Sequence, residues 1–150
     1  MKKVYLQKIF MGSLVGIDFG IKRTGLACTD PKQLIASGLK NLPTAEVISF
    51  LKQYCGEEEV DAFIVGKPLQ KDGTPSTVED QILSFIKLLE NQFPNQKIFR
   101  YDERFTSKIA FQTLINTGSS KKQRRDKGLV DQISATLILQ SYLNHKANSL

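Results

Sequence analysis

The chain has 150 residues, of which 41% are hydrophobic, and its 21 lysine and arginine residues outnumber 15 acidic residues to give a net charge of +6. This length and apolar fraction suit a single domain with a real core, and they disfavour a disordered chain or a two-domain enzyme. Two cysteines and one histidine, His145, are too few for a disulfide framework or a multi-histidine zinc site, and they disfavour Ser-His-Asp or Cys-His catalysis. We therefore expect a cytoplasmic protein with reduced thiols, and no stretch approaches the length of a membrane span.

Residues 1–12 are expected to be a lead-in to the first strand. They carry Lys2, Lys3 and Lys8 and begin like a secretory signal, but polar residues interrupt the apolar run and no small-residue cleavage site follows. Met11 is an alternative start of the chain. If translation begins there, the three lysines have no part in the function.

The first half of the chain predicts three strands, a helix and a fourth strand. The expected ranges are strands at 13–20, 24–29 and 34–39, a helix at 45–54 and a strand at 60–65. Thr44 is the candidate N-cap of the helix, and Gly56 is its expected terminator. The run at 60–65 is continuously apolar, which is typical of a strand buried on both faces.

The second half predicts a helix, a strand and two further helices. Ser76 and Glu79 have the spacing of a capping box, and the apolar residues after them recur on one helix face. A strand at 97–101, a helix at 107–116 and a last helix at about 129–143 follow. The element order β-β-β-α-β-α-β-α-α implies an α/β fold with a mixed five-stranded sheet, in which three antiparallel strands precede parallel crossovers and helices flank both faces.

Three carboxylates lie where such a sheet would form a site, at the carboxyl ends of its strands. Asp18 is in the apolar first strand, where burial of an unpaired carboxylate costs several kcal/mol, so it needs a positive partner or a metal. Glu103 ends the strand at 97–101, and Asp131 lies in the first turn of the last helix. Taken singly, Glu103 could pair with Arg104 and Asp131 could interact with the helix dipole. Together, oxygen-only ligands suit Mg²⁺ or Mn²⁺, which can promote phosphodiester hydrolysis.

Four motifs surround these acids in order: GIDFGIKRTGLA at 16–27, VGKPL at 65–69 with DGT at 72–74, DERFTS at 102–107, and DQISA at 131–135 running into LQSYL at 139–143. Together they resemble the YqgF (RuvX) family over residues 13–143. The resemblance implies an RNase H-like fold, kinship with Holliday junction resolvases, and a cytoplasmic nuclease that matures the 5′ end of pre-16S rRNA during ribosome biogenesis. We accordingly expect a lead-in at 1–12, one RNase H-like nuclease domain at 13–144 and a tail at 145–150.

The resemblance also implies which acids bind metal: Asp18, Glu103 and Asp131. Related resolvases often carry a second acid three residues before the last one, where this chain has Gly128. Three carboxylates can hold one ion well, so we expect one Mg²⁺ or Mn²⁺ ion and leave a second ion open. Asp102 is expected to point to the opposite face from Glu103 if the strand continues through both residues.

A basic segment at 119–128 leads directly into the helix that carries Asp131. It holds five basic residues against Asp126, a net charge of +4. We expect it to bind phosphates irrespective of sequence, although a solvated surface is the ordinary alternative. The basic residues of the segment are Lys121, Lys122, Arg124, Arg125 and Lys127.

Three more basic residues lie near the acids in sequence. Lys22 and Arg23 follow Asp18 in the first hairpin and are candidate phosphate contacts. Arg104 is expected either to orient Glu103 or to contact the scissile phosphate. Gly73 is interpreted as an ordinary turn residue. The aromatic residues are mostly expected in the core, among them Phe63, Phe85 and Phe99.

The leading hypothesis is a metal-dependent nuclease that acts on structured RNA, with precursor rRNA and the assembling ribosome as partners. A branched-DNA resolvase is the alternative within the same chemistry, and a non-catalytic RNA-binding assembly factor is the alternative of a different class. The run at 17–20 would also fit the first phosphate loop of an actin-like ATPase, but 150 residues cannot supply the second domain that encloses the nucleotide. The oligomeric state and the cleavage position stay open.

Overall fold

The structure is a computed structural model that describes residues 12–106 and 127–148. At 127–131 and at 148 it describes the helix backbone without the side chains. The helix expected at 107–116 and the lysines of the lead-in lie outside the described residues. So do four basic residues of the segment before the last helix: Lys121, Lys122, Arg124 and Arg125.

The described strands form one mixed sheet. They are β1 (Ser13–Asp18), β2 (Arg23–Thr29), β3 (Ala36–Pro43), β4 (Val60–Lys67) and β5 (Lys97–Asp102). Their order is β3-β2-β1-β4-β5, with antiparallel pairing of β1, β2 and β3 and parallel pairing of β1, β4 and β5. This confirms the predicted mixed five-stranded sheet.

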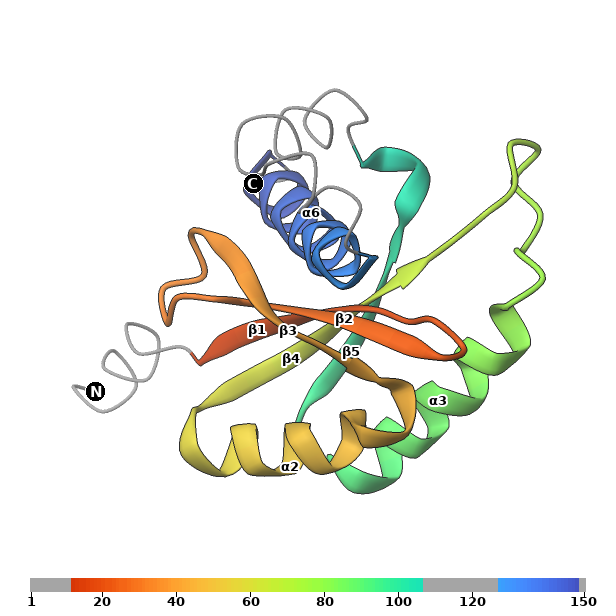
Figure 1. Cartoon of the computed structure of the whole chain (residues 1–150). Helices are drawn as coiled ribbons and strands as arrows, with labels where there is room; N and C mark the ends of the chain where they lie inside the picture. The colour runs from red at the N-terminus through yellow and green to blue at the C-terminus, as the bar shows by residue number, and fades with distance from the viewer. Residues whose placement is uncertain (1–11, 107–126, 149–150) are drawn as a thin grey trace.

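Helices cover both faces of this sheet, as predicted (Figure 1). The α-helices are α2 (Val47–Glu57), α3 (Glu79–Gln92) and α6 (Lys127–Asn148), and two short 3₁₀ turns are η1 (Thr44–Glu46) and η2 (Glu103–Phe105). Of the α-helices that the structure describes, α2 and α3 lie on one face and α6 lies on the other. Among the described helices, none is both long enough and apolar enough to span a membrane.

Strand alternation divides the core into two layers. Val15 and Ile17 of β1 pack with Phe63 and Val65 of β4 toward α2 and α3. The intervening residues face α6, where the buried layer consists of Leu14, Ala27, Ala62, Ile64, Tyr101, Ala135, Ile138, Leu139 and Leu143. β1 and β4 are therefore apolar on both faces because both faces are covered, as predicted for the run at 60–65.

The expected boundaries of α2 were wrong. Thr44 is not its N-cap, because the Thr44 hydroxyl donates to the Gly20 carbonyl oxygen (2.6 Å) and a 3₁₀ turn precedes the helix. Gly56 does not end the helix, which runs through Glu57. The third strand also lies later than expected, at Ala36–Pro43. The difference at the start of α2 arises from the contacts that tie Thr44 to the β1–β2 hairpin, where its hydroxyl binds Gly20 and its amide donates to the Lys22 carbonyl oxygen.

The capping box predicted at the start of α3 does not form as expected. Ser76 Oγ accepts from the Val78 amide (3.3 Å), but the Glu79 side chain is bound to Arg100 on β5. The Glu79 carboxylate is therefore used in a tertiary ion pair rather than in a local cap. Gly73 does occupy a turn, with φ +88°, as predicted.

The last helix is longer than predicted, and Phe99 is not a core residue. α6 begins at Lys127 and ends at Asn148, and His145 near its end is held by a hydrogen-bond contact between its Nδ1 and the Tyr101 hydroxyl (3.1 Å). Phe63 and Phe85 are buried as predicted, whereas Phe99 is 40% exposed. Its strand, β5, is the outermost of the described strands, so within the described residues it has a neighbouring strand, β4, on one side only.

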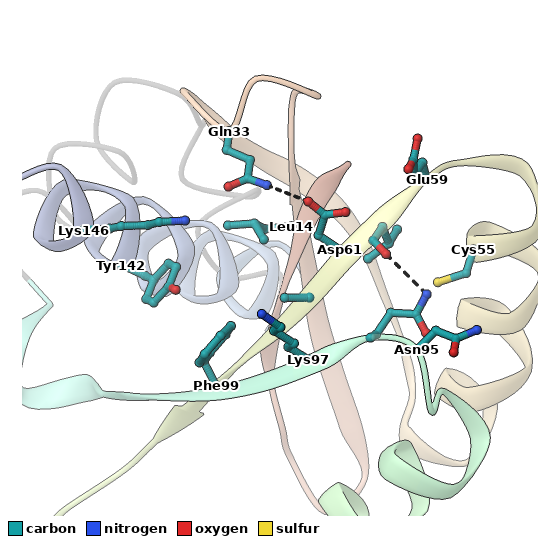
Figure 2. A pocket seen from close by; sticks show the side chains of 13 residues that line it. Leu14, Gln33, Cys55, Glu59, Asp61, Asn95, Lys97, Phe99, Tyr142 and Lys146 are labelled. Atoms are coloured by element: carbon teal, nitrogen blue, oxygen red, sulfur yellow. Dashed lines mark hydrogen bonds between the residues drawn. The ribbon is translucent and has the colours of Figure 1, made fainter. Parts of the chain in front are cut away.

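A pocket of about 640 Å³ opens at the amino-terminal ends of the parallel strands (Figure 2). Leu14, Val60 and Lys97, at or next to the starts of β1, β4 and β5, line it together with α6 side chains. Because parallel strands share their direction, this pocket lies at the opposite edge of the sheet from the carboxyl ends where the acids were expected.

Replacement of Gly16 by alanine is expected to lower the free energy of unfolding by about 1–3 kcal/mol, because α6 leaves no room for a methyl group there. A Cβ at Gly16 would lie 2.9 Å from Leu139 Cβ and 3.1 Å from the Ala135 carbonyl oxygen. Gly56→Ala is the matched control, since nothing lies within 4 Å of a Cβ there and alanine favours the helix by about 0.5–1 kcal/mol. Urea unfolding of both variants measures the difference, and equal stabilities would contradict the close packing of α6.

Candidate active site

The carboxyl ends of β1, β4 and β5 lie side by side. The last register pair of β1 and β4 is Ile17 with Val65, and Lys67 of β4 pairs with Asp102 of β5. Asp18 follows Ile17 directly and thus lies level with Gly66 on the neighbouring strand. The β1–β4 contact is also where the sheet changes from antiparallel to parallel pairing, which is the point expected for a site.

The Glu103 carboxylate lies on the bare backbone of β4. A Cβ at Gly66 would be 3.0 Å from Glu103 Oε2, and it would also be 2.9 Å from Ile138 Cδ1 of α6. The Glu103 carboxylate therefore occupies the α6 face of the sheet. Successive residues of β1 point to opposite faces of the sheet, and Ile17 points toward α2 and α3. Asp18 therefore points to the α6 face, as does Gly16 two residues earlier, which packs against α6. The structure thus brings Asp18 and Glu103 to one face and one end of the sheet.

The third predicted acid, Asp131, lies in α6, and its side chain is outside the described residues. Asp131 was expected in the first turn of the last helix. Because α6 begins at Lys127, Asp131 instead falls in the second turn. The dipole interaction considered for it is weaker there. Position 131 is one turn before Ala135, whose carbonyl oxygen contacts Gly16. Gln140 accepts from the Ala36 amide, and Thr136, one turn earlier in α6, lies beside Gly38. By the register of β1, β2 and β3, the start of α6 therefore lies toward the carboxyl end of β1.

Burial raises the pKa of Glu103 above its ordinary value. The neighbouring charge of Arg100 opposes this shift, and that of Asp102 adds to it. Asp102 itself is bound to Arg104, with Nη2 to Oδ2 at 2.8 Å and Nε to both oxygens at 3.1 Å. This pairing is the main reason that the pKa of Asp102 lies below its usual range. The Arg104 guanidinium thus binds Asp102, whereas the expectation was that Arg104 pairs with Glu103 or orients it.

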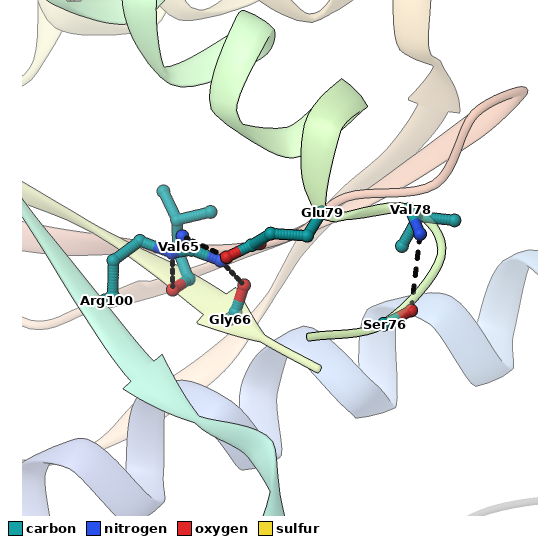
Figure 3. A network of polar contacts seen from close by, with 6 residues as sticks. All are labelled: Val65, Gly66, Ser76, Val78, Glu79 and Arg100. Atoms are coloured by element: carbon teal, nitrogen blue, oxygen red, sulfur yellow. Dashed lines mark hydrogen bonds and ion pairs between the residues drawn. The ribbon is translucent and has the colours of Figure 1, made fainter. Parts of the chain in front are cut away.

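Behind this site, on the α3 side of the sheet, Arg100 joins three segments (Figure 3). Its guanidinium binds Glu79 in a bidentate ion pair, with Nη2 to Oε1 at 2.8 Å and Nη1 to Oε2 at 3.2 Å. It also donates to the backbone oxygens of Val65 (3.4 Å) and Gly66 (3.1 Å). Arg100 therefore fixes the end of β4 directly beneath the Glu103 carboxylate. Sequence reasoning missed this pair, since nothing local links positions 79 and 100.

Three exposed basic side chains and one partly buried lysine lie on the segments next to the two acids. Lys22 and Arg23 are exposed in the hairpin that follows Asp18, as predicted. Arg104 is also exposed, and the turn at Gly73 approaches its Nη1. Lys67 was missed by the sequence reasoning. It ends β4, between the ends of β1 and β5, and its charge helps to lower the pKa of Asp102.

The donors assembled here are carboxylate oxygens, which suit a hard divalent cation. Among the side chains that the structure describes, no three ligating groups form a metal site. Only two of the three predicted ligands, Asp18 and Glu103, have described side chains. Gly66 leaves the space in which the Glu103 carboxylate rests, so the donor set and the backbone beneath it fit such an ion. The site can therefore combine a cation with phosphate contacts from the surrounding basic residues.

The chain matches the sequence model of the RuvX family, described as Holliday junction resolvase, over residues 12–145. A Flavobacterium johnsoniae protein named "Putative pre-16S rRNA nuclease" is 52% identical over 136 residues, which cover 91% of this chain and 99% of that protein. A protein of the same name from Parabacteroides distasonis is 44% identical over 140 residues, covering 93% of this chain and 100% of the relative.

Solved structures share the fold at low sequence identity. RuvC from T. thermophilus, in complex with a Holliday junction substrate, has a TM-score of 0.56 at 12% identity and covers 92% of this chain and 97% of its own. The fowlpox virus resolvase, in complex with Holliday junction DNA, has a TM-score of 0.56 at 15% identity and covers 89% of this chain and 98% of its own. These likenesses confirm the predicted RNase H-like fold.

Replacement of Glu103 by glutamine is expected to stabilise the metal-free protein at neutral pH. The folded-state pKa of Glu103 is raised above its ordinary 4.5, so the folded wild type binds a proton more tightly than the unfolded chain. Wild-type stability therefore falls as the pH rises from the unfolded pKa through the folded one, whereas the variant has no such loss. Urea unfolding in EDTA between pH 4 and 7 measures this, with Glu90→Gln on the exposed side of α3 as control. A constant difference across this range would contradict the raised pKa.

Proposed function

The chain belongs to the RuvX family of Holliday junction resolvases, and from this premise we propose that it is a nuclease that hydrolyses phosphodiester bonds at the carboxyl ends of β1, β4 and β5. Its catalytic and metal-binding residues in this proposal are Asp18, Glu103 and Asp131. The observation that carries the proposal is the Glu103 carboxylate resting on Gly66, level with Asp18, on the face that α6 covers.

The proposed cofactor is one Mg²⁺ or Mn²⁺ ion. Asp18 and Glu103 supply carboxylate oxygens from two strand ends, and the course of α6 supports Asp131 as the third ligand. When bound, such an ion activates water and stabilises the leaving oxygen of a phosphodiester. Burial raises the pKa of Glu103, so a proton would compete with the ion for the oxygens of this carboxylate more strongly than at an exposed glutamate.

The proposed natural substrate is precursor 16S rRNA in the cytoplasm, in keeping with the names of the relatives. Exposed cations on the segments that follow the strands would bind its phosphates on either side of the acids. They are the predicted residues Lys22, Arg23 and Arg104, and the partly buried Lys67 at the end of β4 joins them. Branched DNA is the second candidate, favoured by the description of the family and by the junction-bound resolvases of the same fold.

Asp18→Asn is expected to reduce cleavage by about 100-fold or more, since loss of a bound ion removes several kcal/mol of charge stabilisation. Cleavage of precursor rRNA and of junction DNA, each with and without Mg²⁺ or Mn²⁺, provides the measurement. Glu103→Gln and Asp131→Asn should behave alike, and Glu90→Gln on the exposed side of α3 should cleave like the wild type.

The same assay separates the alternatives. Metal-dependent cleavage of the RNA alone identifies an rRNA nuclease, and cleavage of the junction alone identifies a resolvase. If the wild type with metal cleaves neither substrate better than Asp18→Asn does, the proposal of a nuclease is wrong, and a non-catalytic RNA-binding factor becomes the better interpretation.

The predicted basic segment can be tested by its effect on salt dependence. Lys121→Ala combined with Arg124→Ala is expected to weaken RNA binding irrespective of sequence. Each lost phosphate contact should flatten the slope of log affinity against log salt by about 0.7–0.9. Fluorescence anisotropy across a salt series measures the slope, with Lys52→Ala and Lys87→Ala on exposed positions of α2 and α3 as the matched control. An unchanged slope would mean that the segment is solvated surface.

A further inference from the structure

The pocket at the amino ends of the parallel strands lies away from the acids, on the same face of the sheet. Its volume of about 640 Å³ is within the range of small-ligand sites. One wall comes from β5 and one from α6, and the floor is formed by the first residues of β1 and β4 (Figure 2). Of the acids proposed for catalysis, the two whose side chains the structure describes, Asp18 and Glu103, do not line it.

Two aromatic rings form one wall. Phe99 of β5 and Tyr142 of α6 stack with ring centroids 6.1 Å apart and an interplanar angle of 25°. Phe99 is 40% exposed although it is a large apolar residue within a strand. An exposed ring with a fixed orientation is a stacking surface, and stacking on such a ring is worth about 1–3 kcal/mol per nucleobase.

Two exposed lysines flank these rings. Lys97 begins β5 and Lys146 lies in the last turn of α6, and Figure 2 shows both reaching toward the pocket. Lysines beside an aromatic wall can bind the phosphate of a nucleotide whose base lies on the rings.

Amide and carboxylate groups complete the opposite side. Gln33 Nε2 donates to Asp61 Oδ2 (3.3 Å) and to the Gly12 carbonyl oxygen (2.7 Å), so the Asp61 charge is partly offset. Gln96 Nε2 donates to the Val60 carbonyl oxygen (3.3 Å). Side chains of these types bind the polar edges of nucleobases.

Strand β5 connects the pocket to the proposed active site. Phe99 and Glu103 are four residues apart, about 13 Å along an extended strand. A nucleic-acid strand of a few nucleotides can span this distance along β5, so one molecule could occupy both places.

We propose that this pocket binds an unpaired nucleotide of the substrate, with its base stacked on Phe99 and Tyr142 and its phosphate bound by Lys97 and Lys146. The inference rests on the proposed function, since it assumes a nucleic-acid substrate. Base and phosphate are common to RNA and DNA, so the chemistry of the pocket accepts a single strand of either. A duplex is excluded because its bases are stacked on one another.

The test measures binding without cleavage. Fluorescence anisotropy of a labelled single-stranded RNA oligonucleotide, and of its DNA counterpart, is recorded in EDTA with the full chain. Phe99→Ala is expected to weaken binding of one or both by about tenfold, in line with the loss of one stacked base. Phe99→Tyr keeps a ring and should bind like the wild type. Lys97→Gln with Lys146→Gln should flatten the salt slope by about 0.7, because the two lysines bind one phosphate.

Matched controls lie on the other face of the sheet. Leu88→Ala removes a comparably exposed apolar side chain of α3, and Lys52→Gln with Lys87→Gln removes two exposed charges. The proposal is overturned if Phe99→Ala binds both single strands as Leu88→Ala does, or if it weakens duplex binding equally. Asp18→Asn keeps the two proposals apart: it should lose cleavage in the nuclease assay with metal, yet in the binding assay it should retain the dependence of binding on Phe99.

Discussion

The close approach of α6 to the sheet at Gly16 and Gly66 is the constraint on which the site depends. At both glycines a Cβ would lie 2.9 Å from an α6 side-chain atom, so the helix packs there on backbone. Protein interiors cannot absorb an added methyl group without movement of a neighbour. The register of α6 against β1 and β4 is therefore fixed, and with it the path along which the helix carries Asp131 toward the strand ends.

The same absence of a side chain at Gly66 gives Glu103 its place, and the charge of that carboxylate is offset from the other side of the sheet. Arg100 alternates with Phe99 and Tyr101 along β5, so its guanidinium extends toward α3, where Glu79 and two β4 carbonyl oxygens bind it. From there its charge opposes the rise in the pKa of Glu103 that burial causes, and the guanidinium does not occupy the α6 face. A cation that stood beside the carboxylate on the α6 face would compete with a metal ion for the same oxygens.

The sequence predicted the architecture because β-prone runs and amphipathic stretches follow one another in an order that allows few topologies, and the acids at strand ends followed from that order. The sequence-based predictions were wrong where residues distant in the sequence determine the contacts or the burial of a side chain. Glu79 has the spacing of a capping box, yet its carboxylate binds an arginine from β5. Phe99 lies in an apolar run, yet an edge strand leaves its ring partly exposed. Asp18 and Glu103 could be placed at one edge from the pattern, whereas the space at Gly66 that receives Glu103 required the packed structure.

In the proposed nuclease, side chains on strand ends and exposed side chains of the connecting segments would bind two different partners, a metal ion and a polyanion. A metal ion needs its ligands held within a fraction of an ångström, which strand ends provide for Asp18 and Glu103. Phosphate binding by lysine and arginine tolerates variation in distance, so exposed side chains such as Lys22 and Arg23 suffice. Stacking again needs a fixed surface, and Phe99 has one because it lies on β5, the strand that leads directly into Glu103. The two contacts that require precise placement thus share one strand, and a substrate bound to the ring would meet the acids at a constant distance.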